Sequence, residues 1–187
     1  MKKETVKERI LRVASDLFYR EGIRSVGIDR IIEESGAAKA SFYRSFKTKD
    51  DLIVAYLEAR QELKLELLEK VRRLHPHSLK DQLGEVVQEV VNRMRNSDCR
   101  GCPFLNAVVE FPDPEHPSHV KALNVHQNYW SKVQELAKEG GARNPEELAV
   151  QLQMLYCGFA MKGAMDKSID PDAFRNAAVA LIDYHTQ

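Results

Sequence analysis

Two cysteines and two histidines in the middle of the chain have spacings that could bind a metal ion. Two residues separate Cys99 from Cys102, and two separate His116 from His119. Zinc sites of the Cys2His2 type need a slightly longer gap between their histidines, and the stretch between these pairs reads as a helix rather than a hairpin. We therefore expect no metal site and no cofactor. A thioredoxin-like redox pair is also disfavoured, because no strand precedes it.

Cys102 has the sequence context of a reactive thiol. Pro103 suits the first position of a helix, so Cys102 would lie at a helix N-terminus, where the helix dipole favours a thiolate, with Arg100 nearby. Two interpretations stay open: a sensor of oxidants or electrophiles, and a small half-buried residue at a cap position. Cys157 lies in an apolar stretch and is predicted to pack in the core.

Catalytic patterns do not stand out. The sequence has no evident Ser-His-Asp arrangement, glycine-rich phosphate loop or pair of carboxylates. Asn106 and Glu110 share one predicted helical face, where they more readily add polarity to a pocket than perform catalysis. We expect that the chain is not an enzyme. A helical binding protein that never touches DNA is the other alternative.

A short polar helix is the most informative feature. Helices 28–35 and 38–46 are joined through Gly36, which permits the sharp turn of a helix-turn-helix. Phe42 and Phe46 are predicted to pack inward. The remaining side chains suit a major groove, since Arg can bind guanine through two hydrogen bonds while Lys, Ser and Tyr can bind phosphate. These outward residues are Lys39, Ser41, Tyr43, Arg44 and Ser45.

The distribution of charge agrees with a protein that has one end facing phosphates. The 187 residues carry no net charge, with 43% hydrophobic and 30% charged residues, as in a folded globular protein. Residues 1–49 nevertheless hold 12 Lys and Arg against 7 Asp and Glu, whereas the rest holds 16 against 21. A basic amino-terminal part followed by an acidic remainder is typical of a chain with one nucleic-acid-binding end.

Helical periodicity runs through nearly the whole chain, and no segment alternates with period two. Thr5 and Glu8 form a capping box at the start of the first helix, and Gly22 can end that helix in a left-handed conformation. A long helix over 49–74 has an apolar face predicted to point inward, made of Ile53, Tyr56, Leu57, Leu63, Leu67, Val71 and Leu74. Further helices are expected at about 79–96, 104–111, 117–139, 145–167 and 171–185. The fold class is all-α, with domains at 1–48 and 49–187.

The stretch over residues 5–57 resembles, without gaps, the DNA-binding domain of the tetracycline-repressor family. The resemblance is carried by Gly22-Ile23, by Ile28 to Ile31, by Ser35-Gly36, by Ala38 to Lys47 and by Lys49 to Leu52. It implies a three-helix helix-turn-helix domain followed by a helical ligand-binding and dimerisation domain. The implied function is a repressor that binds near-palindromic operator DNA as a homodimer and releases it when an effector binds.

Roles for single residues follow from the resemblance by motif position. The implied DNA contacts are Lys39, Ser41, Tyr43 and Arg44, with Lys49 on a phosphate. This chain departs from the family at the start of the second helix, where Val26-Gly27 replaces a common threonine. The contact with phosphate there would fall to Ser25 or to backbone N–H groups.

The remainder of the chain predicts an effector pocket and a dimer interface. The pocket is expected between helices, and its candidate residues are Phe104, Asn106, Glu110, Tyr129, Trp130, Met154 and Tyr156. The last two helices are expected to form a four-helix bundle with a second copy through Leu148, Leu152, Leu155, Phe159, Phe174, Ala178 and Leu181. The signal stays open between a small molecule, oxidation of Cys102 and a protein partner. With no apolar run of about 20 residues and no signal peptide, we expect a cytoplasmic protein without a membrane partner.

Overall fold

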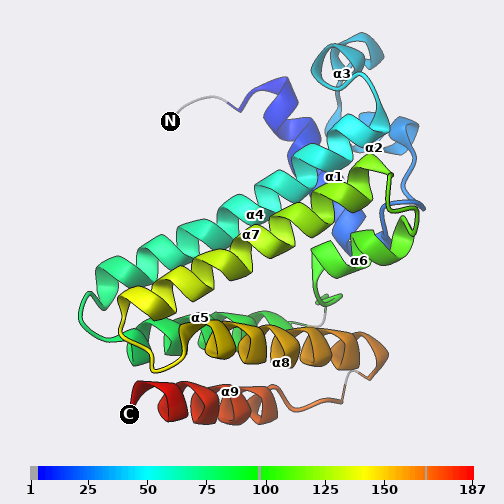
Figure 1. Cartoon of the computed structure of the whole chain (residues 1–187). Coiled ribbons are helices and arrows are strands. Elements are labelled where there is room, and N and C mark those ends of the chain that lie inside the picture. Colours follow the sequence, from blue (N-terminus) through cyan, green and yellow to red (C-terminus); the bar gives the residue numbers. More distant parts are fainter. Residues whose placement is uncertain (1–3, 97, 167) are drawn as a thin grey trace. The chain divides into compact units, whose positions relative to one another are not determined.

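In the computed structural model, which describes residues 4–96, 98–166 and 168–187, all regular elements are helices (Figure 1). The all-α fold class is therefore confirmed. In chain order the helices are α1 Val6–Glu21, α2 Ile28–Ser35, α3 Lys39–Ser45, α4 Lys49–Leu74, α5 Leu79–Met94, α6 Pro103–Glu110, α7 Pro117–Glu139, α8 Pro145–Met165 and α9 Pro171–Thr186.

The chain divides into two compact units. The first unit contains residues 1–60 and 103–125, and the second contains residues 61–102 and 126–187. Helices α4 and α7 therefore each contribute to both units. Each unit is discontinuous in sequence, because α6 and the start of α7 group with the amino-terminal helices; the domains at 1–48 and 49–187 stay a prediction.

The helix ends in the first unit follow from local hydrogen bonds. The Thr5 N–H donates to the Glu8 carboxylate at 2.7 Å, and the Glu8 N–H donates to the Thr5 hydroxyl at 3.2 Å, which confirms the capping box. Thr48 and Asp51 repeat this reciprocal pair at the start of α4, at 2.9 and 3.1 Å. Each pair satisfies two backbone donors that a helix N-terminus would otherwise leave open.

Two glycines end the first two helices in different ways. Gly36 has φ 61° and ψ 25°, the left-handed conformation that closes α2 and allows the turn into α3. Gly22 also has a positive φ, 97°, but its ψ is 148°, so the chain leaves α1 extended and does not adopt the left-handed helical conformation expected there. Both positions favour glycine because a Cβ makes positive φ costly.

The core of the first unit is formed by residues that α1–α4 bury completely. Phe18 and Tyr56 meet edge to face with ring centroids 5.6 Å apart, joining α1 to α4. The residues of this unit with no exposed surface include Ile10, Ala14, Leu17, Ile31, Phe42, Leu52 and Leu57. Burial of this apolar face fixes α3 in place and leaves its other face to solvent.

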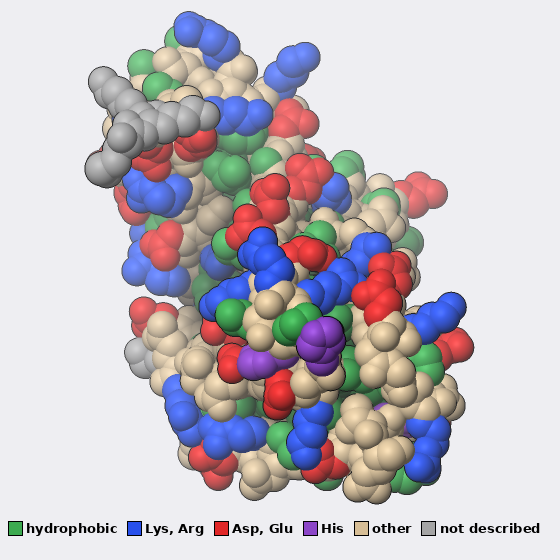
Figure 2. All heavy atoms as spheres, turned by 90° about the vertical axis from the view of Figure 1, so that its left-hand side faces the viewer, with side chains coloured by type: hydrophobic (Ala, Val, Ile, Leu, Met, Phe, Trp, Pro, Cys, Tyr) green, Lys and Arg blue, Asp and Glu red, His purple; other side chains and the backbone are tan. Residues whose placement is uncertain are grey.

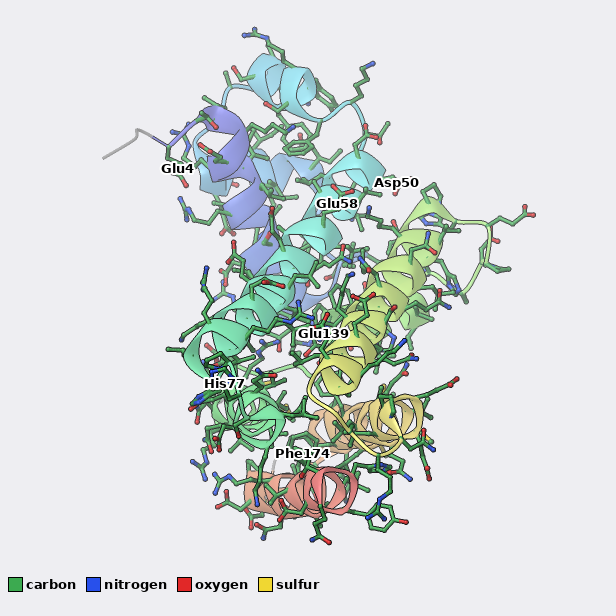
Figure 3. The ribbon with its side chains drawn as sticks, turned by 60° about the vertical axis from the view of Figure 1, so that its left-hand side comes forward. Glu4, Asp50, Glu58, His77, Glu139 and Phe174 are labelled. Carbon is green, nitrogen blue, oxygen red and sulfur yellow. The ribbon has the colours of Figure 1, made fainter. Side chains whose placement is uncertain are left out.

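The second unit packs α5, α8 and α9 together (Figure 1). The rings of Phe159 and Phe174 stack with centroids 4.6 Å apart, and Figure 3 shows Phe174 between these helices. Gly101 has φ 77°, and a Cβ at this position would lie 2.9 Å from the Ala160 carbonyl oxygen. A larger residue at 101 would therefore push α8 away from the segment before α6.

Some expectations about faces and ends need correction. Leu63 and Leu74, expected inside, are 59% and 58% exposed, whereas Lys64 is only 8% exposed. Helix α5 ends at Met94 and α8 at Met165, each two residues earlier than expected; the expected end of α8 at Lys167 lies outside the described residues.

Candidate DNA-binding helix and effector cavity

Helix α3 has one buried aromatic face and one exposed polar face. Phe42 and Phe46 are 0% and 4% exposed, with ring centroids 6.3 Å apart. Lys39, Tyr43 and Arg44 are exposed. Lys and Arg side chains stand out from the surface of the molecule at the end that holds α3 (Figure 2). The helix therefore presents exposed donors on a support that buried aromatic side chains hold in place.

The exposed donors of α3 are held only weakly. The Lys39 ammonium lies 3.3 Å from the Asp29 carboxylate, and the two side chains are 67% and 88% exposed. Such a pair contributes little stability in water, so Lys39 can exchange Asp29 for a phosphate at small cost. Ser41 is half-buried, and its carbonyl oxygen accepts a hydrogen bond from the Ser45 hydroxyl at 2.9 Å.

Ser25 and Lys49 make contacts within the segment between α1 and α2. The Ser25 hydroxyl lies 2.8 Å from the Glu21 carbonyl oxygen and 2.9 Å from that of Gly22, so it caps the end of α1. The Lys49 ammonium donates to the Arg24 carbonyl oxygen at 3.5 Å and lies 5.9 Å from the centre of the Phe18 ring. Burial lowers the pKa of Lys49, and the nearby Glu110 carboxylate opposes this effect.

Glu110, a candidate pocket residue, lies against the same segment. Its carboxylate accepts a 2.8 Å hydrogen bond from the Arg24 N–H, and its carbonyl oxygen accepts one of 3.4 Å from the Arg24 guanidinium. These two hydrogen bonds hold the end of α6 against the segment between α1 and α2. No pattern in the sequence pairs residues this far apart, so sequence reasoning could not find the contact.

The second unit contains a cavity of about 50 Å³ lined by residues of α4, α5, α7, α8 and α9. Three of the candidate pocket residues, Tyr129, Trp130 and Tyr156, line it. Met154 does not, since its side chain points to solvent and is 62% exposed. The other candidates belong to the first unit: Phe104 is fully buried there, Asn106 is half-buried and Glu110 binds Arg24.

Lys64 lines this cavity and was missed by sequence reasoning. Its ammonium lies 4.6 Å from the ring centre of Tyr129 and 4.7 Å from that of Tyr156, and it donates to the Tyr156 hydroxyl at 3.4 Å. Burial is the main cause that lowers the pKa of Lys64. Arg93, which also lines the cavity, lowers that pKa further.

The aromatic and imidazole groups near Lys64 are held uncharged. Burial raises the pKa of Tyr129 to about 12 and raises that of Tyr156 well above its ordinary value. Burial, together with the Lys64 charge, lowers the pKa of His126 to about 4. Near neutral pH the His126 ring is therefore neutral, and its Nε2 accepts a 3.2 Å hydrogen bond from the Trp130 indole.

The three cysteines are free thiols, and two of them are buried. Cys99 and Cys102 are 4% and 1% exposed, and Cys157 is half-buried. A reactive thiol needs access as well as thiolate character, so a reagent would reach Cys102 only after local opening. Within the described part of the chain, no three potential ligands among His, Cys, Asp and Glu come together.

The structure uses most of the expected dimer residues inside the chain. Leu148 and Ala178 are fully buried, and Leu152, Phe159 and Phe174 are 5–6% exposed; Leu155 and Leu181 are half-buried. The same two helices expose other small or apolar residues at helical spacing. On α8 these are Val150, Met154, Gly158, Met161 and Met165, and on α9 they are Ala173, Ala177, Ala180 and Tyr184.

No helix within the described ranges is both long enough and apolar enough to cross a bilayer.

The chain is similar in sequence and in fold to known bacterial regulators. The sequence pattern of bacterial regulatory proteins of the tetR family matches residues 10–56. A crystal structure of a TetR-family transcriptional regulator from Streptomyces coelicolor is 34% identical, with a TM-score of 0.87 over 97% of this chain and 96% of that chain. A TetR transcriptional regulator from Legionella pneumophila has the same fold at 20% identity, with a TM-score of 0.81 over 98% of each chain.

A curated protein, the uncharacterized HTH-type transcriptional regulator YezE of Bacillus subtilis (strain 168), is 29% identical over 113 residues. That match covers 57% of this chain and 56% of the Bacillus protein.

Proposed function

The chain belongs to the TetR family of transcriptional regulators, and we propose that it is a repressor that binds near-palindromic operator DNA as a homodimer and releases it when an effector binds. Its relatives are regulators and not enzymes. The observation that carries the proposal is the outward polar face of α3, held in place by the buried Phe42 and Phe46. A regulator of this kind acts where the genome is, in the cytoplasm.

The DNA contacts follow from that face. Arg44 is the candidate for reading a base, because a guanidinium can donate two hydrogen bonds to guanine in the major groove. Lys39, Ser41 and Tyr43 contact phosphates or bases beside it. Lys49 and Ser25 reach phosphates if they leave the Arg24 carbonyl and the α1 carbonyls that they bind in this structure.

A homodimer supplies the second recognition helix that one short helix needs for useful affinity. The proposed interface consists of the exposed faces of α8 and α9. Met154 and Met161 are 62% and 49% exposed, and the helical surface between them is open at Gly158, where a Cβ would meet no atom within 4 Å. When two chains associate, the exposed apolar faces of α8 and α9 in one chain pack against the same faces of the other. The four helices then form a bundle.

The proposed effector site is the cavity in the second unit. Its volume of about 50 Å³ has room for roughly a few water molecules, so a larger effector must push the surrounding helices apart. Helix α4 carries both Lys64, in the cavity wall, and Lys49, beside Arg24. A displacement of α4 at Lys64 would therefore be transmitted along a continuous helix to the segment that positions the DNA-binding helices. A ligand that binds one arrangement more tightly shifts the balance between them.

The test is a titration of the purified chain against duplex DNA from the regions flanking its own gene. The proposal predicts sequence-specific binding that weakens as salt rises, and release by at least one compound in a broad metabolite panel. The same assay is run with a thiol-reactive electrophile on the wild type and on Cys102→Ser. Equal release of both would exclude thiol sensing at Cys102. Binding that no compound and no electrophile reverses would favour a protein partner as the signal.

A further inference from the structure

A buried cation is built into the wall of the cavity in the second unit. Lys64 is 8% exposed, and its ammonium is held between the rings of Tyr129 and Tyr156 at 4.6 and 4.7 Å. Moving a lysine out of water is costly, although the two aromatic faces and the Tyr156 hydroxyl offset part of that cost. Packing alone does not require a lysine at this position, since a methionine would fill the same space without a charge.

A second cation lines the same cavity. The Arg93 guanidinium forms no salt bridge with a carboxylate among the described residues, and its charge acts on Lys64 enough to lower the pKa of that lysine. Arg93 and the carboxylate that also lines the cavity, Glu89, are both exposed to solvent, whereas Lys64 is buried in the cavity wall. The remaining wall is almost entirely apolar or aromatic, including Leu67, Val86 and Leu83.

We infer that this cavity binds the carboxylate of a small apolar acid, with the Lys64 ammonium as the buried counter-charge and the Arg93 guanidinium as a second donor. The inference rests on the proposed function, because it names the chemical class of the effector. A cationic effector is disfavoured by two positive groups, and Lys64 already lies against the rings of Tyr129 and Tyr156. A neutral apolar effector would leave the buried ammonium with less hydration and no new partner.

Binding of such an acid is coupled to proton uptake by Lys64. The anion stabilises the charged form of Lys64, so it raises the pKa that burial lowers in the ligand-free protein. Affinity is then constant below the ligand-free pKa of Lys64 and falls as pH rises above it. The other ionisable groups that line the cavity or interact electrostatically with Lys64 are Glu89 and Arg93 on α5, His126 and Tyr129 on α7, Tyr156 and Cys157 on α8, and Cys102 before α6. Between about pH 6 and 8 the His126 ring and both tyrosines stay neutral.

The test uses two matched pairs of probes, benzoate with benzamide and hexanoate with hexanamide, each differing only in the charged group. Binding to the full chain is measured by isothermal titration calorimetry in two buffers of different ionisation enthalpy, so that proton uptake is counted. Lys64→Met keeps the volume of the side chain and removes the charge. Lys70→Met is the matched control, because Lys70 is an exposed lysine on the same helix. Arg93→Gln tests the second donor.

We expect at least one carboxylate to bind ten-fold or more tightly than its amide, with proton uptake that grows as pH rises. Lys64→Met abolishes this preference, Arg93→Gln reduces it, and Lys70→Met retains it. The inference is overturned if neither carboxylate binds more tightly than its amide, or if Lys64→Met keeps the preference. Operator binding by the ligand-free chain is measured separately. If DNA is bound without any preference for carboxylates, the inference alone fails; carboxylate binding without DNA binding would count against the repressor.

Discussion

The carboxylate of Glu110 at the end of α6 accepts a 2.8 Å hydrogen bond from the backbone N–H of Arg24, in the segment between α1 and α2. Sequence reasoning placed Glu110 in an effector pocket, whereas the structure uses it to fasten the segment that leads into the helix-turn-helix. The acceptor is charged and the donor is a backbone amide, a combination stronger than a neutral hydrogen bond.

Glu110→Ala removes this acceptor and frees the Arg24 amide. We expect the variant to lose on the order of 1–2 kcal/mol of stability, and hydrogen exchange at the Arg24 amide to become faster. Glu110→Gln is the control, since its amide oxygen can still accept the bond and should keep most of the protection. Equal exchange in all three proteins, measured by NMR, would show that the contact does not hold this segment in solution.

Arg44→Ala should cost about 1–3 kcal/mol in operator binding and relax the base preference at one position of each half-site. Lys49→Ala should weaken binding to all sequences alike and reduce the salt dependence by about one phosphate contact. Lys138→Ala serves as the control, because this lysine is exposed near the end of α7, in the second unit. Fluorescence anisotropy at several salt concentrations separates the two effects. Unchanged binding in both variants would contradict the assignment of α3.

Met161→Glu places a charge on the exposed apolar face of α8. If α8 and α9 form the dimer, this charge is buried at the interface, so the variant should be monomeric at micromolar concentration and bind operator at least ten-fold more weakly. Val109→Glu is the matched control, because Val109 is 69% exposed on α6. Sedimentation velocity gives the oligomeric state. A wild type that is already monomeric, or a dimeric Met161→Glu, would contradict the proposed interface.

Lys64 should make stability depend on pH. Burial lowers its pKa in the folded state below the ordinary 10.5, so the unfolded chain binds more protons than the folded chain between those two values. Stability should therefore rise with pH through that window, by up to about 1.4 kcal/mol per pH unit, and be lost as pH falls. Lys64→Met should remove this rise, whereas Lys70→Met should retain it. Urea unfolding from pH 7 to 9.5 measures the slopes; equal slopes in wild type and Lys64→Met would contradict a perturbed Lys64.

The parts of the fold that depend on local chemistry could be predicted from the sequence. The capping box of Thr5 and Glu8, the turn at Gly36 and the inward Phe42 and Phe46 all arise within a few residues, and the structure confirms each. Gly22 is a partial exception: a glycine there predicts positive φ, but its ψ depends on where the following chain must go.

The parts of the fold that depend on tertiary packing could not be predicted from the sequence. Over 26 residues, α4 passes different neighbours on different faces, so one apolar stripe does not describe it, and Leu63 is exposed where Lys64 is buried. On α8 and α9 both faces are apolar. Periodicity detects the faces but does not say that Leu152 and Phe159 pack inside the chain while Met154 and Met161 face outward.

Selection of bound duplexes from a randomised DNA library by the full chain measures whether a pair of α3 helices binds DNA in a sequence-specific way. We expect enrichment of one near-palindromic sequence, bound by two copies of the chain, with half-sites about one helical turn or a related spacing apart. Arg44→Ala should enrich a sequence that differs within the half-sites. Enrichment of no sequence by the wild type, or of a single asymmetric site bound by one chain, would rule out sequence-specific binding by two α3 helices.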